Sequence, residues 1–190
     1  MTLLAKNIGG IFSKSQLSAA DHNKFIKHLK KIYDAEEDND EFLSNFIDCL
    51  KVALVHGERE NSVNLVLDFA AKFAASFEIG NENPEDSCHP FYEGLFDFLL
   101  NNHNVKSQAV RFRVCQFINR LLDELNESAS INSDLFDRIY EAMLERVQDR
   151  IASVRVQAVI ALQRLQDPTN KDCPVIKVKN LILLAIGIPS

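Results

Sequence analysis

Apolar residues recur every three or four positions along most of this chain, the spacing that places them on one face of an α-helix. The segment that begins at Asn61, for example, carries Val63, Val66, Leu67 and Ala70 at this spacing. No run of alternating β-branched residues bounded by turns interrupts the pattern. We therefore predict an all-α chain, with helices over residues 12–34, 41–56, 61–78, 91–102, 107–126, 134–148 and 152–166.

Polar segments separate these helices and arrange them in pairs. Residues 57–60 break the second helix from the third, and residues 80–90 have the Gly, Asn and Pro content of a loop. The acidic run 34–41 is interpreted as a solvated linker that also places negative charge at the start of the next helix. We expect an extension (1–11), a solenoid (12–168) and a divergent tail (169–190). The solenoid would hold a leading helix (12–34) and three units, about 41–78, 91–126 and 134–167.

One stretch of the chain is repeated imperfectly 44 residues later. Residues 110–123 align with 154–167, so that a Val-Arg pair, an Arg-Leu pair and a closing Asp coincide. A period near 44 built from two helical segments is typical of HEAT-type repeats, whose units run about 40–47 residues. We therefore predict a HEAT-repeat α-solenoid of stacked antiparallel helix pairs. Solenoids of this kind mostly hold partners rather than transform substrates.

Composition narrows the class of protein further. The formal net charge of −6 gives the chain no overall basic footprint of the kind that many nucleic-acid binders show, although a local basic stripe remains compatible with it. Cys49 and Cys115 lie inside apolar helical patterns and are expected to be reduced, buried thiols of an intracellular protein. The longest apolar run, Leu181–Ile188, is far shorter than the about 20 residues that span a bilayer, so we expect a soluble protein with no membrane contact.

Neither catalytic nor metal-binding motifs stand out. The chain has no G-x-S-x-G, Walker lysine loop or G-x-G-x-x-G. His22 and His28 would point different ways on a helix, and Cys88 and His89 are adjacent in a loop without a second pair nearby. We expect no enzymatic activity, no metal and no cofactor.

A charged pair in the third unit suggests a structural role. Asp149 falls in the turn between the two helices and Arg155 early in the second helix, where HEAT repeats commonly hold an Asp and an Arg that hydrogen-bond along the stack. We expect Arg155 to bond Asp149 or an equivalent turn and to link neighbouring units. Arg111 aligns with Arg155, but Val105 occupies the position equivalent to Asp149, so Arg111 has no Asp from its own turn.

Further cations fall at equivalent positions of the units. Lys106 and Arg150 lie in inter-helix turns that align, Arg120 aligns with Arg164, and Arg113 lies on the same helix as Arg120. Stacked units bring equivalent positions onto one edge, where a row of cations could follow DNA phosphates and release counterions. These five are the candidate DNA-binding residues. The alternative is an ordinary charged surface.

Three stretches together resemble one family. They are Asp68–Phe77 (DFAAKFAASF), Ala109–Leu122 with its AVRFRVC segment, and Val154–Pro168 with its RLQDP segment. In sequence and spacing they are similar to the HEAT region near the N-terminus of condensin subunit 3, the non-SMC component of condensin that is also called CAP-G. The resemblance runs from about residue 12 to about residue 176 and is lost beyond it, so we expect a shortened form of a longer array.

The resemblance implies a role. Members of the family are non-catalytic regulatory subunits of condensin, the complex that compacts mitotic chromosomes. They bind the kleisin subunit CAP-H, through it the SMC2/SMC4 ATPase pair, and together with CAP-H they hold double-stranded DNA. Expected locations are the nucleus and mitotic chromosomes, with the cytoplasm in part, and DNA binding by the isolated chain is expected to be weak. The alternative is a generic HEAT adaptor that holds proteins without touching DNA.

Overall fold

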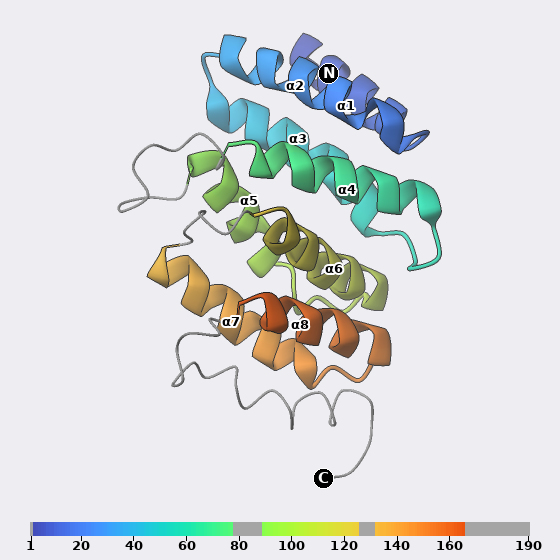
Figure 1. Ribbon diagram of the computed structural model, residues 1–190, viewed down its shortest axis with the longest axis vertical. Helices are drawn as coiled ribbons and strands as arrows, with labels where there is room; N and C mark the ends of the chain where they lie inside the picture. The colour runs from blue at the N-terminus through green and yellow to red at the C-terminus, as the bar shows by residue number, and fades with distance from the viewer. Residues whose placement is uncertain (1, 78–88, 126–131, 166–190) are drawn as a thin grey trace.

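The computed structural model describes residues 2–77, 89–125 and 132–165 of the chain. Within these ranges the structure consists of α-helices and one short 3-10 turn, drawn in Figure 1. The elements are α1 (Leu3–Ser15), η1 (Ala19–Asp21), α2 (His22–Ala35), α3 (Asn39–Leu54), α4 (Asn61–Ala75), α5 (Pro90–Leu100), α6 (Gln108–Glu124), α7 (Ser133–Val147) and α8 (Ala152–Arg164).

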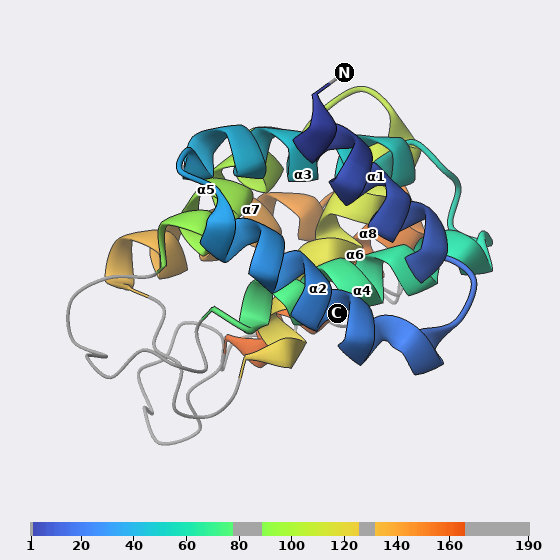
Figure 2. The ribbon, with the colours of Figure 1, turned by 90° about the horizontal axis from the view of Figure 1, so that it is seen from above.

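The helices form antiparallel pairs that stack in sequence order from the N-terminal to the C-terminal end of the molecule (Figure 1). Helices α1, α3, α5 and α7 contact one another in succession and form one layer, while α2, α4, α6 and α8 form the second (Figure 2). The first and second helix of each pair are joined on the same edge of the molecule, at the right in Figure 1. The predicted all-α solenoid of stacked antiparallel pairs is confirmed.

Side-chain caps explain where several helices begin. The Asp38 carboxylate accepts hydrogen bonds from the amides of Asp40 (3.0 Å) and Glu41 (2.9 Å) at the start of α3. The Asn132 side chain accepts one from the amide of Leu135 (2.8 Å) at the start of α7. Each cap satisfies backbone donors that have no partner inside the helix. The acidic run expected as a linker therefore also supplies the cap of α3.

Aromatic side chains join the first three helix pairs into one core. Phe73 of α4 stacks on Phe46 of α3, with ring centroids 5.4 Å apart, and meets the edge of Phe91 of α5 at 5.5 Å. Tyr33 of α2 contacts Phe42 of α3 at 5.0 Å. Buried aromatic rings contribute large apolar areas, so this cluster fixes how the pairs stack. Leu121 and Leu165, which align in the 44-residue repeat, are both buried.

The predicted leading helix 12–34 is wrong, because two helices occupy this part of the chain. Helix α1 already begins at Leu3, inside the expected extension, and η1 separates it from α2. Gly9 and Gly10 lower the helix propensity of this segment, since each glycine costs about 1 kcal/mol relative to alanine inside a helix. Packing overrides this cost: Ile8, Ile11 and Phe12 are buried in the core. The described solenoid thus has four helix pairs, where the sequence predicted three and a leading helix.

Other sequence-based expectations meet the structure only in part. Both cysteines in the described part of the chain, Cys49 and Cys115, are free thiols, with Cys115 buried and Cys49 half-buried. None of the described helices is long and apolar enough to cross a membrane. The predicted tail 169–190, together with Cys88 and Cys173, lies outside the described residues.

Candidate binding surface at the inter-helix turns

The inter-helix turns of the second, third and fourth pairs lie along one edge of the solenoid, at the right of Figure 1. We call this the turn edge; it comprises residues 55–60 between α3 and α4, 101–107 between α5 and α6, and 148–151 between α7 and α8. All the cations singled out in the sequence come from these turns or from helices α6 and α8, which follow them. The structure separates these cations into two groups, those that bond other groups of the protein and those that face solvent.

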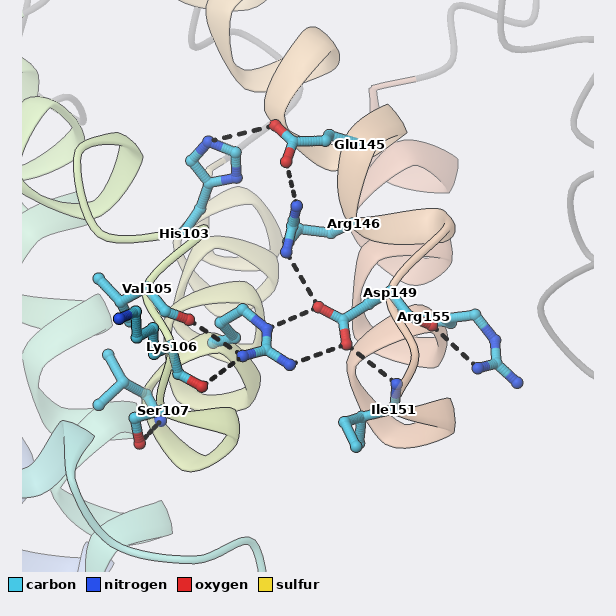
Figure 3. Close-up of polar contacts among 11 residues, drawn as sticks. His103, Val105, Lys106, Ser107, Glu145, Arg146, Asp149, Ile151 and Arg155 are labelled. Carbon is cyan, nitrogen blue, oxygen red and sulfur yellow. Dashed lines mark hydrogen bonds and ion pairs between the residues drawn. The ribbon is translucent and has the colours of Figure 1, made fainter.

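Arg111 and Asp149 form a buried link between the third and fourth helix pairs; in Figure 3, Arg111 is the unlabelled guanidinium bonded to Asp149. The Arg111 guanidinium donates from Nε to Asp149 Oδ2 (2.7 Å) and from Nη2 to Oδ1 (3.1 Å). Its remaining nitrogen, Nη1, donates to the carbonyls of Val105 (3.0 Å) and Lys106 (2.9 Å) in its own turn. The side chains of Arg111 and Asp149 are only 7% and 2% exposed. A buried, bidentate arginine–carboxylate pair is both strong and geometrically specific.

The Asp149 carboxylate is satisfied from several sides. It also accepts hydrogen bonds from Arg146 Nη1 (2.9 Å) and from the amide of Ile151 (2.9 Å). Burial by itself raises the pKa of Asp149, but the hydrogen bonds from Arg111 and Ile151 and the charges of Arg111 and Arg146 outweigh it, so the pKa lies below its usual value. The hydrogen bond to Asp149 raises the pKa of Arg111 in turn. Both groups are therefore held in their charged forms.

Arg155 bonds the α7–α8 turn, as expected: its Nη1 donates to the backbone carbonyl of Asp149 (3.0 Å). Arg111 makes the equivalent bond to Val105, one repeat earlier. The Asp149 carboxylate itself accepts from Arg111 of the preceding pair, so this carboxylate links the third and fourth pairs through Arg111.

Arg113 was expected at a DNA-binding surface, and the structure contradicts this. Its side chain is fully buried, and its guanidinium donates to the carbonyls of His56 (3.1 Å from Nε) and Gly57. Its Nη1 donates to the side-chain oxygens of Asn64 and Gln116, both at 2.7 Å. Burial, followed by the charge of Arg120, lowers the pKa of Arg113. Arg113 therefore joins α6 to the α3–α4 turn and has no surface to offer a phosphate.

Arg120 and Arg164 form equivalent links between the second helices of successive pairs. Arg120 bonds the Asn64 carbonyl (2.6 Å) and pairs with Asp68 (3.0 Å) on α4. Arg164 bonds the Asn119 side chain (2.7 Å) and pairs with Asp123 on α6. In both cases the acceptors are an Asn and an Asp four positions apart on the preceding helix. The predicted alignment of the two arginines is real, but both are engaged within the protein, with side chains 20% and 35% exposed.

Lys106 and Arg150 remain at the surface. Both side chains are exposed on the turn edge, one in the α5–α6 turn and one in the α7–α8 turn, as the sequence alignment placed them. Arg59 of the α3–α4 turn is a further exposed cation on this edge that the sequence analysis did not single out. Its signal was its position in the break between two predicted helices, the same kind of position that drew attention to Lys106 and Arg150.

The turn edge is hollowed between the turns of the second, third and fourth pairs. An open hollow of about 450 Å³ is bordered by Arg59, Glu58 and Glu60 of the α3–α4 turn, and by residues at the starts of α6 and α8, among them Gln108 and Ser153. Two carboxylates beside one guanidinium make the potential of this hollow mixed. The edge can therefore bind an anion at Lys106 and Arg150 more favourably than in the hollow itself.

The described residues offer little for chemistry. No group of three or more His, Cys, Asp or Glu side chains gathers there in a way that could hold a metal ion. Burial raises the pKa of the Cys115 thiol to about 12, which leaves it protonated and unreactive. His103 packs beside the Arg111–Asp149 link, with Nε2 3.9 Å from Glu145 (Figure 3), and burial lowers its pKa.

Comparisons with known proteins agree on one family, although no family model matches the sequence. Condensin complex subunit 3 of Xenopus laevis is 48% identical over 174 residues, which are 90% of this chain and 17% of the relative. The same subunit of Homo sapiens is 42% identical over 167 residues, 87% of this chain and 16% of the relative. The chain thus spans less than a fifth of the length of these relatives.

A solved structure supports the same assignment. A chain in the crystal structure of the S. pombe condensin Cnd3-Cnd2 subcomplex superposes on this one with a TM-score of 0.70 at 27% sequence identity, covering 93% of this chain and 21% of that chain. The sequence resemblance stated above is confirmed by these matches. The chain belongs to the family of condensin complex subunit 3.

Proposed function

We propose that this chain is a non-catalytic HEAT-repeat part of a condensin regulatory subunit, which acts in mitotic chromosome condensation by holding a kleisin partner and double-stranded DNA. The observation that carries the proposal is the combination of family membership with a described surface that holds exposed cations in equivalent turns. Such a protein works where condensin works, on chromosomes in the nucleus.

The DNA contacts we propose are few. Lys106 and Arg150 are the two cations of the original five that face solvent without an ion pair in the described structure, and Arg59 joins them on the same edge. Each phosphate that a cation neutralises contributes salt-dependent affinity that is independent of DNA sequence. With so few contacts, and with Glu58 and Glu60 beside Arg59, the isolated chain binds DNA weakly. A partner must supply the remaining contacts.

The partner we propose is the kleisin subunit CAP-H, which would connect the chain to the SMC2/SMC4 ATPase pair. The support is the structural relative, which was solved as a subcomplex of Cnd3 with Cnd2. This chain matches 21% of that relative, so it would contribute only part of such an interface. The proposal for this chain is therefore a contribution to a shared kleisin and DNA surface.

Co-expression of the chain with the CAP-H segment tests the partner, and DNA titration of the resulting pair tests the turn edge. We expect the two chains to co-purify and the pair to bind a DNA duplex more tightly than the chain alone. Lys106→Glu/Arg150→Glu should weaken binding to DNA duplexes of unrelated sequence to the same extent. The control is Lys14→Glu/Lys51→Glu, a double charge reversal in helices α1 and α3 that leaves Lys106 and Arg150 intact. This control should weaken DNA binding less. A pair that binds DNA equally well with Lys106 and Arg150 reversed would favour the alternative of a protein-binding adaptor.

A further inference from the structure

Helix α2 presents a row of lysines on its outer surface. Lys24, Lys27 and Lys31 are exposed and follow at three- and four-residue spacing, while Leu29 and Tyr33 on the opposite side are buried. We call the three exposed lysines the α2 lysine face. None of the ion pairs in the described part of the chain involves them. Although the net charge of the chain is −6, these three unpaired cations make this part of the surface locally positive.

A neighbouring lysine shows what a structural role would look like. Lys30 of the same helix is half-buried, donates from Nζ to the carbonyl of Ser76 (3.0 Å), and lies 5.1 Å from the centre of the Phe77 ring. It holds α2 against the end of α4. The α2 lysine face has no such contacts among the described residues, so α2 does not need these three charges in order to pack.

An open hollow with a mixed lining of apolar and polar side chains adjoins the α2 lysine face. About 510 Å³ of space lies between α1 and α2, lined on the α1 side by Leu3, Leu4 and Asn7 and on the α2 side by residues that include Lys31 and Ile32. The Leu3 side chain is 76% exposed, although it is large and aliphatic. The exposed leucine beside the hollow and the unpaired lysines together give this surface an apolar part next to a cationic part.

We infer that α1 and α2 form a docking surface for an acidic peptide segment that carries a large apolar side chain. The apolar side chain would fill the hollow beside Leu3 and Ile32, and the acidic residues would lie over the α2 lysine face. A DNA duplex fits the same surface less well, because its phosphates would pair with the lysines but would leave Leu3 in water. This surface is separate from the turn edge and does not depend on the proposed DNA contacts.

The charges around the hollow also determine where the apolar and the acidic parts of the peptide would lie. Glu36 lines the hollow at the end of α2, and the acidic run 34–41 continues from there. Acidic residues of a partner would be repelled at that end and attracted toward Lys24 and Lys27, nearer the start of the helix. The apolar anchor therefore sits at the Leu3 end of the site, and the acidic residues extend along α2 over Lys27 and Lys24, short of the exposed Asp21 that precedes the helix.

The test uses the full chain and a fluorescein-labelled synthetic peptide made of glutamates with leucines at helical spacing, measured by anisotropy. A second peptide with the leucines replaced by glutamines is the control for charge alone. Leu3→Ser is matched by Leu17→Ser, because both leucines are 76% exposed but Leu17 does not line the hollow. Lys24→Glu/Lys27→Glu is matched by Lys14→Glu/Lys51→Glu, which changes the net charge equally on other helices.

We expect the leucine peptide to bind and the glutamine peptide to bind at least tenfold more weakly. Leu3→Ser and Lys24→Glu/Lys27→Glu should each weaken binding at least fivefold, and their matched controls less than twofold, with unchanged circular dichroism in all four variants. The inference is overturned if neither peptide binds, if both bind equally, or if the variants and controls lose affinity alike. It is also overturned if Lys24→Glu/Lys27→Glu abolishes binding of a DNA duplex while leaving the peptide unaffected, since the lysines would then form a phosphate surface.

Discussion

The Arg111–Asp149 pair gives the sharpest prediction about stability, because it should dominate the junction between the third and fourth helix pairs. Replacing Arg111 with alanine removes two bonds to the Asp149 carboxylate and two to backbone carbonyls, all between 2.7 and 3.1 Å. The Asp149 side chain, 2% exposed, then keeps a buried charge with Arg146 as its remaining cation. Breaking a buried pair by removing one partner costs about 3–5 kcal/mol.

Arg155→Ala is the internal control for this estimate. Arg155 occupies the equivalent position one repeat later, and its Nη1 donates to the Asp149 carbonyl. Losing a hydrogen bond of this kind costs about 1–3 kcal/mol. The two substitutions remove the same atoms from equivalent positions of two helices, so Arg155→Ala shows what losing an arginine at this repeat position costs.

Urea unfolding followed by circular dichroism measures both effects, and a double-mutant cycle of Arg111→Ala with Asp149→Ala measures the coupling. We expect Arg111→Ala to lower the free energy of unfolding more than Arg155→Ala does, and the coupling to be about 2 kcal/mol. The proposed role of this junction is refuted if Arg155→Ala costs as much as Arg111→Ala, or if the effects of Arg111→Ala and Asp149→Ala simply add.

Three further predictions concern buried polar groups. Arg113→Ala should lower the free energy of unfolding by about 2–4 kcal/mol, because it leaves buried acceptors unsatisfied. Lys106→Ala, at an exposed position, should change it by less than about 0.5 kcal/mol. Equal melting temperatures for the two variants would contradict this prediction. Folding lowers the pKa of Asp149, so the stability that its charge contributes is complete above the unfolded pKa of about 3.9 and is lost as the pH falls through the folded pKa. The stability advantage of the unsubstituted chain over Asp149→Asn should therefore shrink below about pH 4. An advantage that stays constant with pH would contradict this assignment. Burial lowers the pKa of His103, so protonation of this side chain favours the unfolded state. The free energy of unfolding should fall as the pH drops below about 6.5. If His103→Gln loses stability with falling pH as steeply as the unsubstituted chain, other groups cause that loss.

Most of the fold could be predicted from the sequence, because the apolar period and the 44-residue repeat both reflect the packing of helix pairs. The prediction failed at α1, where Gly9 and Gly10 lower the intrinsic helix propensity but the buried Ile8, Ile11 and Phe12 hold the segment as a helix. Propensity is a local quantity and packing is not. The N-terminal pair could be recognised only once α3 was in place beside α1.

The candidate site was less predictable, because exposure on a central helix depends on its neighbours. Helix α6 has α4 on one side, α8 on the other and α5 behind it, so Arg113 is buried although its position suggested a surface. The partner of Arg111 was open to inference: its own turn offers Val105, and the next turn, one repeat later, offers Asp149. The repeat alignment shows that Val105 and Asp149 are equivalent positions, but the stacking of the pairs decides which of the two turns faces Arg111.

The most direct test of the central claim is the salt dependence of DNA binding by the complex of this chain with CAP-H. The claim is that Lys106 and Arg150 contact phosphates while Lys24 and Lys27 serve another partner. For Lys106→Glu/Arg150→Glu, the slope of log affinity against log salt concentration should flatten by the amount expected for the loss of about two phosphate contacts. For Lys24→Glu/Lys27→Glu, the slope should stay close to that of the unsubstituted complex. An unchanged slope with Lys106 and Arg150 reversed, or a slope that flattens only with Lys24 and Lys27 reversed, would contradict the claim.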